Sequence, residues 1–192
     1  MLSGDERYPL DSPFHGEPAG YGRSRYAAEL MTSTLGTYEL FAELSIALAG
    51  FSGVASAFGG RNREFSPIEK SRLDAMFQFS GASLGASLLV LTLAEAGMPE
   101  SKVFSSVCAL SGAAILAIAC RQLPRVIPLY QDGESTTSRG FLTFAIPYLF
   151  GLSIFYFWAA IYDQSSWPLF AGISSQLLWG LWMFARFLLR AQ

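Results

Sequence analysis

Three glutamates are the residues of this 192-residue chain whose type and position could do chemistry: Glu39, Glu43 and Glu95. Each lies at the edge of a long apolar run or just inside it, and these runs could cross a membrane. Carboxylates inside a membrane are costly, and by default they indicate an ion or proton site. Residues 44–60 are nearly long enough to span by themselves, which would leave Glu43 at the water boundary. We therefore favour carboxylates at the membrane surface, with an outer acidic site for cations as the alternative.

Aromatic side chains crowd the last third of the chain, and Gln176 lies among them in the middle of an apolar run. Trp158, Trp179 and Trp182 belong to this crowd. A glutamine within a membrane typically forms a hydrogen bond to another helix, and tryptophans gather where lipid meets water. We expect a lipid-facing surface here. An apolar binding site for a quinone, a pigment or a specific lipid is the alternative.

The residues needed for other site chemistry are missing from the sequence. His15 is the only histidine, so a histidine-based metal, haem or triad site has no second member. Cys108 and Cys120 are twelve residues apart in one apolar run, about 18 Å along a helix, which is too far for a disulfide. No phosphate-binding glycine loop or nucleophile elbow occurs either. We predict no catalytic residue, no cofactor, no metal site and no enzymatic activity.

The composition of the chain indicates an integral membrane protein. Hydrophobic residues make up 52% of the sequence and charged residues 15%, whereas charged residues are about a quarter of a soluble domain. The charges gather in short intervals between uncharged runs, and about 20 apolar residues suffice for a membrane-spanning helix. The net charge of −2 leaves no basic face for a nucleic acid.

We predict an all-α fold, an integral membrane bundle of five transmembrane helices that forms a single domain over residues 24–192. A flexible polar tail, residues 1–23, is expected before it because its prolines, glycines and mixed charges oppose regular packing. The expected spans are 38–58, 75–96, 103–120, 141–162 and 169–188.

Small side chains recur at every fourth position in these runs, which is typical of membrane helices in close contact. We expect helix-packing faces at Ser45, Ala49, Gly53 and Ala57, at Gly81 and Gly85, and at Ala109 and Ala113. In the last run Gly172, Gln176 and Gly180 share one stripe.

Two polar intervals give signals for helix ends. In Ser66-Pro67-Ile68-Glu69 the serine can cap a helix, the proline suits its first position and the glutamate completes a capping box. A helix should therefore begin at Pro67 and continue into the second span. The interval 121–140 contains Pro124 and Pro128, and we expect a loop there because proline breaks a continuing helix.

The basic residues predict an orientation. With five spans, nine lysines and arginines fall on one side of the membrane and four on the other. The richer side is normally cytoplasmic, which places the amino terminus outside and the carboxyl terminus in the cytoplasm. A four-span arrangement with one re-entrant segment is the alternative.

Two segments of the first hairpin, AGFSGVASAFGGR and FSPIEKSRLDAMFQFSGASLGASLL, resemble a group of small bacterial multi-pass membrane proteins with no assigned activity. The group shares an AGF-small-G first span, an arginine after it, a W/F-S-P-x-[DE]-[KR]-x-R elbow and a second span of small residues. The resemblance covers about residues 41–125, and Phe65 stands where tryptophan is more usual. It implies the bacterial cytoplasmic (inner) membrane and no catalytic residues.

These patterns favour a non-catalytic membrane protein that acts by association, either as an accessory subunit of a membrane complex or as a self-assembling oligomer. Packing motifs are abundant, while ionisable groups deep within the spans are scarce. The expected partners are membrane lipids and other membrane subunits or further copies of the chain. One alternative is a small oligomeric cation channel or transporter in which Glu39, Glu43 and Glu95 form an outer acidic ring. A weaker alternative is binding of a lipid, quinone or pigment by the aromatic carboxyl-terminal half.

Overall fold

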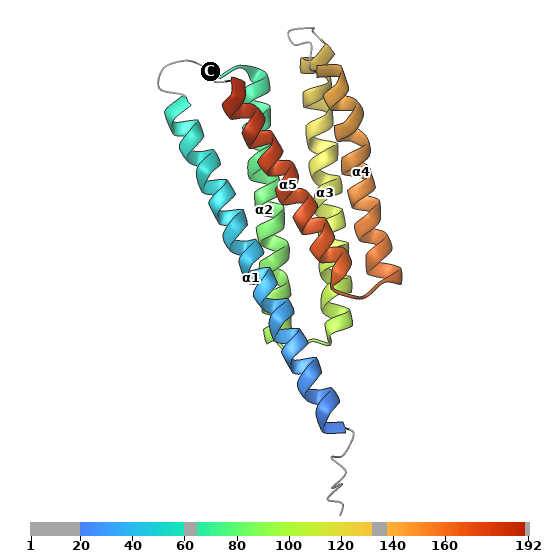
Figure 1. Ribbon diagram of the computed structural model, residues 1–192. Helices are drawn as coiled ribbons and strands as arrows, with labels where there is room; N and C mark the ends of the chain where they lie inside the picture. The colour runs from blue at the N-terminus through green and yellow to red at the C-terminus, as the bar shows by residue number, and fades with distance from the viewer. Residues whose placement is uncertain (1–19, 60–64, 132–137, 191–192) are drawn as a thin grey trace, which may run out of the picture. The chain divides into compact units, whose positions relative to one another are not determined.

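Five α-helices make up the regular structure in the computed structural model, which describes residues 20–59, 65–131 and 138–190. They are α1 (Gly20–Gly59), α2 (Pro67–Glu95), α3 (Glu100–Gln131), α4 (Ser138–Tyr162) and α5 (Trp167–Arg190) (Figure 1). The chain divides into two units, Met1–Ser33 and Thr34–Gln192. Residues 20–33 of α1 belong to the first unit, and the rest of α1 with helices α2 to α5 belongs to the second. The all-α prediction is confirmed.

The predicted polar tail lies outside the described residues up to residue 19. Gly20 to Arg23, which the sequence assigns to that tail, are the first turn of α1 instead. The prolines of the tail all precede Gly20, the last being Pro18. No proline lies within Gly20–Gly59, so none interrupts the backbone hydrogen bonding of α1.

Three segments are long and apolar enough to cross a membrane: Glu69–Glu95, Glu100–Arg125 and Thr143–Tyr162. They lie in α2, α3 and α4 and correspond to the second, third and fourth predicted spans. Length and composition therefore indicate a multi-pass membrane protein.

Helix α2 begins where the sequence predicts, with a complete capping box. The Ser66 hydroxyl accepts a hydrogen bond from the Glu69 backbone N–H (3.3 Å), and the Glu69 carboxylate accepts one from the Ser66 backbone N–H (2.9 Å). Pro67 opens the first turn, where its missing N–H leaves no hydrogen bond unmade. At the other end of α2, Gly97 turns the chain toward α3 at φ +73°, a left-handed conformation that suits glycine.

Helix α3 runs further than the sequence predicts. The interval after Cys120 is not a loop: the helix continues to Gln131 with Pro124 and Pro128 inside it. Each proline removes one backbone hydrogen bond, but both are exposed, so their rings need no space inside the bundle. Membrane helices tolerate such prolines when neighbouring helices support them, and α3 lies against both α2 and α4.

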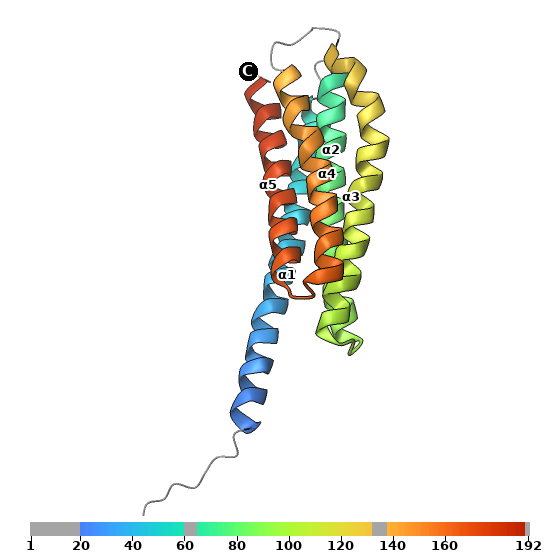
Figure 2. The same cartoon turned by 90° about the vertical axis from the view of Figure 1, so that its right-hand side faces the viewer.

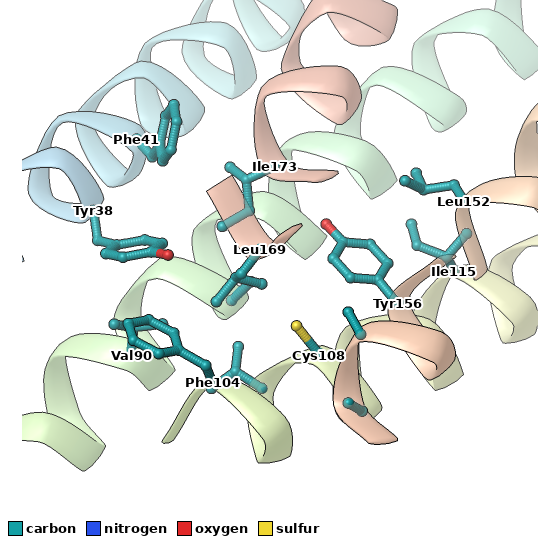
Figure 3. Packing of buried hydrophobic residues seen from close by; sticks show 14 of the residues in the cluster. Tyr38, Phe41, Val90, Phe104, Cys108, Ile115, Leu152, Tyr156, Leu169 and Ile173 are labelled. Atoms are coloured by element: carbon teal, nitrogen blue, oxygen red, sulfur yellow. The ribbon is translucent and has the colours of Figure 1, made fainter. Parts of the chain in front are cut away.

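Within the second unit, α2 lies beside α3 and α5, and α3 lies beside α4 (Figures 1 and 2). A single apolar core joins these helices with the Thr34–Gly59 part of α1. Its fully buried side chains include Tyr38, Ile115, Tyr156, Leu169 and Ile173 (Figure 3).

Aromatic contacts attach α1 to this core. The Tyr38 and Phe104 ring centroids are 6.1 Å apart, and those of Phe41 and Phe170 are 5.1 Å apart. The Tyr38 hydroxyl also donates a hydrogen bond to the backbone oxygen of Ser166 (3.2 Å). Helix α1 therefore packs on α3 and α5 through large side chains.

Candidate functional site

Gln176 of α5 is the centre of a polar contact between three helices. Its side-chain oxygen accepts a hydrogen bond from the Ser83 hydroxyl of α2 (3.1 Å), and its Nε2 donates one to the Tyr156 hydroxyl of α4 (2.6 Å). Ser83 and Tyr156 are 0% exposed and Gln176 is 1% exposed. The amide therefore forms the interhelical hydrogen bonds expected of a glutamine inside a membrane protein.

Gly172 brings α4 and α5 together beside this amide. A β-carbon at Gly172 would lie 2.4 Å from Cζ and from the hydroxyl oxygen of Tyr156, so only glycine leaves room for the phenol. At Gly180 a β-carbon would lie 2.8 Å from Cδ2 of Leu48 on α1. Gly172, Gln176 and Gly180 are all buried. The stripe seen in the sequence is thus a buried face of α5 that receives side chains of α4 and α1.

Two serines hold α3 against α4. The Ser153 hydroxyl donates to the backbone oxygen of Gly112 (2.9 Å), and the Ser105 hydroxyl donates to that of Ala160 (2.7 Å). In the part of the chain that the structure describes, both hydroxyls donate to backbone oxygens, and neither is bonded to a histidine, lysine or carboxylate. The arrangement fixes the register of helices and offers no activated nucleophile.

Sequence reasoning does not identify the partners of Gln176. Ser83 belongs to a stripe of small residues, and Tyr156 stands in the aromatic segment Phe155-Tyr156-Phe157-Trp158. The two partners are 93 and 20 positions away from Gln176 in the chain. No local spacing shows which serine or which aromatic residue lies opposite the amide.

The predicted acidic residues Glu39, Glu43 and Glu95 are exposed. Among the described residues, no group of three or more His, Cys, Asp and Glu side chains is arranged to hold a metal ion. The three glutamates therefore form no cation cluster within one chain. An outer acidic ring would need several copies of the chain around an axis.

The residues predicted for lipid or ligand contact lie in two settings. Trp158 and Trp182 are exposed, whereas Trp179 is partly buried and stacks on Tyr148 with ring centroids 4.5 Å apart. Gln176 is turned toward Ser83 and Tyr156 instead. The tryptophans and the amide are thus separate features.

The small residues expected to form a packing stripe on α1 turn away from the bundle along the helix. Ser45 is buried, Ala49 and Gly53 are half-buried and Ala57 is exposed. Residues four apart are rotated by about 400°, so a four-residue stripe drifts by about 40° at each step. The buried face of α1 follows mixed steps of three and four residues: Tyr38, Phe41, Ala42, Ser45, Leu48 and Ser52.

The glycine pair of α2 has open space above it. Gly81 is exposed, Gly85 is half-buried, and a β-carbon at either position would meet nothing within 4 Å. On α3, Ala109 is half-buried and Ala113 is exposed. The close approach on α3 is at Gly112, where a β-carbon would lie 3.2 Å from Cβ of Tyr156.

An apolar groove of about 430 Å³ lies between α1 and α5, and the sequence does not predict it. Leu44, Leu48 and Phe51 of α1 and Leu177 and Leu181 of α5 are among the residues that line it. The lining is apolar apart from Ser174, which suits hydrocarbon chains.

Asp163 organises the turn between α4 and α5. Its carboxylate accepts hydrogen bonds from the Ser165 hydroxyl (2.6 Å), the Ser165 backbone N–H (3.2 Å) and the Trp167 indole N–H (2.6 Å). The hydrogen bond from the Ser165 hydroxyl is the main cause that lowers the pKa of Asp163 from its ordinary value of 3.8. The Ser165 backbone and Trp167 indole bonds act in the same direction, since all three favour the ionised carboxylate.

Buried Ser83, Gln176 and Ser153 thus connect helices, and the groove and the α2 glycine pair are open to the surroundings. Comparison of the chain with protein-family models, with curated proteins and with solved structures gives no match.

Proposed function

We propose that this protein is a non-catalytic membrane protein that works by association, through an outward face of α2. This surface, the α2 glycine face, consists of Phe77, Gly81, Gly85 and Leu88. The partner is a helix from a second copy of the chain or from another subunit of a membrane complex.

The observation that carries this proposal is the open space above the two glycines. Steps of four, four and three residues place Phe77, Gly81, Gly85 and Leu88 on one side of α2. Phe77, at the edge of this face next to Gly53 of α1, is 43% exposed, and Leu88 is 48% exposed. A β-carbon at Gly81 or Gly85 would meet nothing within 4 Å, so within the described chain no helix occupies this space.

Exposed glycines on a membrane helix need a physical reason. Each glycine costs about 1 kcal/mol of helix stability relative to alanine. Side chains enter above Gly172 and Gly180, whereas none enters above Gly36, Gly50, Gly81, Gly85 or Gly151. Of these open glycines, only Gly81 and Gly85 are four residues apart on one helix. Because the hydrophobic effect does not drive helices together in lipid, close backbone approach at small residues is what holds two membrane helices in contact. A partner helix on the α2 glycine face would supply that contact.

We also propose five spans in the bacterial inner membrane, with the amino terminus outside and the carboxyl terminus in the cytoplasm. The hydrogen bond between Ser83 and Gln176 joins the middle of α2 to the middle of α5, which favours the same depth in the membrane for both helices. The side chain of Leu48 on α1 lies against Gly180 of α5, which favours the same depth for α1 as well. The excess of basic residues, nine against four, supports the orientation.

The association is tested by comparing the wild type with the variants Gly81→Leu and Gly151→Leu. Gly151 on α4 is a matched control, because it too is exposed and a β-carbon there would meet nothing within 4 Å. The measurement is the mass and composition of the particle after gentle extraction from the membrane, by native mass spectrometry. We expect a wild-type complex that Gly81→Leu disrupts and Gly151→Leu preserves.

Two results would contradict the proposal: a monomeric wild-type protein, or equal assembly of the two variants. The composition of the wild-type particle distinguishes the two kinds of partner. Copies of this chain alone identify a self-assembling oligomer, and stoichiometric foreign subunits identify an accessory role.

A further inference from the structure

Arg72 of α2 is a buried charge that lacks a counter-ion among the described residues. The residue is 3% exposed, and its Nη1 is buried without a hydrogen-bond partner. A guanidinium carries a positive charge in proteins. A buried charge without a partner is strongly unfavourable, and buried charges in native proteins are paired. The site around Arg72 therefore lacks an anion.

The carboxylates nearest to Arg72 along α2 are engaged elsewhere. Glu69 accepts a hydrogen bond from the Ser66 backbone N–H in the capping box. Asp74 accepts hydrogen bonds from the side chains of Gln78 and Gln122. Both carboxylates are bonded to other groups, so the anion that Arg72 lacks comes from outside the described residues.

The register of α2 against α5 places a second arginine at the level of Arg72. Ser83 of α2 is hydrogen-bonded to Gln176 of α5. Met76 lies seven residues before Ser83, Met183 lies seven residues after Gln176, and these two methionines belong to one apolar cluster. About one further turn along each helix leads to Arg72 and Arg186. Arg186 has an interaction partner of its own, so the Arg72 guanidinium is the group that lacks an anion at this end of the α2–α5 pair.

We infer that Arg72 binds a phosphate group at this end of the α2–α5 pair. Its guanidinium presents a planar set of N–H donors that matches two phosphate oxygens, and it supplies the opposite charge. The phosphate can belong to the headgroup of an anionic phospholipid or to free phosphate, since both offer the same oxyanion. Because basic pockets at the ends of membrane helices bind lipid headgroups, both sources are tested.

The experiment measures thermal unfolding of the full-length protein in bilayer discs of a galactolipid, whose headgroup carries no phosphate. One arm adds phosphatidylglycerol to the bilayer, and the other adds inorganic phosphate at constant ionic strength. The variants are Arg72→Gln and, as matched control, Arg121→Gln, which removes an exposed arginine of α3. We expect an added anion to raise the unfolding temperature of the wild type and of Arg121→Gln, with binding at least about tenfold weaker in Arg72→Gln.

In bilayers without either anion, Arg72→Gln should unfold at the same temperature as the wild type or higher, because it removes an uncompensated buried charge. A shift with phosphatidylglycerol alone identifies a lipid headgroup, and a shift with inorganic phosphate identifies a free-phosphate site. No shift in the wild type, or an equal shift in Arg72→Gln, overturns the inference. If Arg72→Gln does not fold, Arg72→Lys decides by the same titration: weaker binding supports the site and unchanged binding contradicts it.

Discussion

The phenol of Tyr156 occupies the space in which any residue other than glycine at position 172 would place its β-carbon, 2.4 Å from Cζ of the ring. Because Tyr156 is fully buried, it has little room to move aside. We expect Gly172→Ala to destabilise the protein by about 1–3 kcal/mol, the usual cost of overpacking a core. Reversible unfolding in mixed micelles measures this change. The control Gly151→Ala makes the same substitution in open space and should be neutral or stabilising by up to about 1 kcal/mol. Equal effects of the two variants would contradict the close packing of Tyr156 on Gly172.

Gln176→Leu removes both hydrogen bonds of the buried amide and leaves the Ser83 and Tyr156 hydroxyls without these partners. We expect a loss of about 1–3 kcal/mol in the free energy of unfolding, since buried polar groups without partners are costly. Combining it with Tyr156→Phe in a double-mutant cycle isolates the Gln176–Tyr156 hydrogen bond. Interhelical hydrogen bonds in membranes average about 0.6 kcal/mol, so a coupling energy of zero would show that the bond is not formed.

The Asp163 turn should make stability depend on acid pH. Its pKa is lowered in the folded protein, chiefly by the Ser165 hydroxyl, so the carboxylate binds its proton less readily than in the unfolded chain. The contribution is therefore present above the ordinary pKa of 3.8 and is lost as the pH falls through the lowered value. Measured from neutral to acid pH, the unfolding temperature of Asp163→Asn should fall less than that of the wild type. If the unfolding temperatures of the wild type and of Asp163→Asn fall equally with pH, this carboxylate contributes nothing to the pH dependence of stability.

The five-span arrangement predicts which loops an impermeant maleimide reaches from outside the cell. Cysteine substitutions at the exposed Ser101 and Ser165 should be labelled in intact cells, and one at Ser66 only after the membrane is opened. Replacing Cys120, which is exposed, removes the background. Labelling of Ser165→Cys that requires an opened membrane would support the four-span alternative instead.

The parts of this fold that depend on neighbouring residues are readable from the sequence. Ser66 and Glu69 are three residues apart, so their capping box and the start of α2 follow from the sequence alone. The end of α3 does not: Pro124 and Pro128 predict a break, and the support of neighbouring helices overrides it.

Glycine spacing shows where close contact can occur, but it does not identify the neighbour. Gly81 and Gly85 are four residues apart and meet nothing, whereas Gly172 and Gly180, at a multiple of that spacing, receive Tyr156 and Leu48. What lies opposite a helix depends on residues far away in the chain. For the same reason the sequence predicts a hydrogen-bonded Gln176 without predicting its partners.

The most direct test of association through the α2 glycine face is crosslinking in the intact membrane. A photo-reactive residue at Gly85 should yield one discrete crosslinked product, containing either a second copy of this chain or one identified subunit. The same residue at the exposed Gly151 of α4 should yield lipid adducts alone. If Gly85 also yields lipid adducts alone, or if the protein crosslink forms at Gly151 instead, α2 does not carry the association.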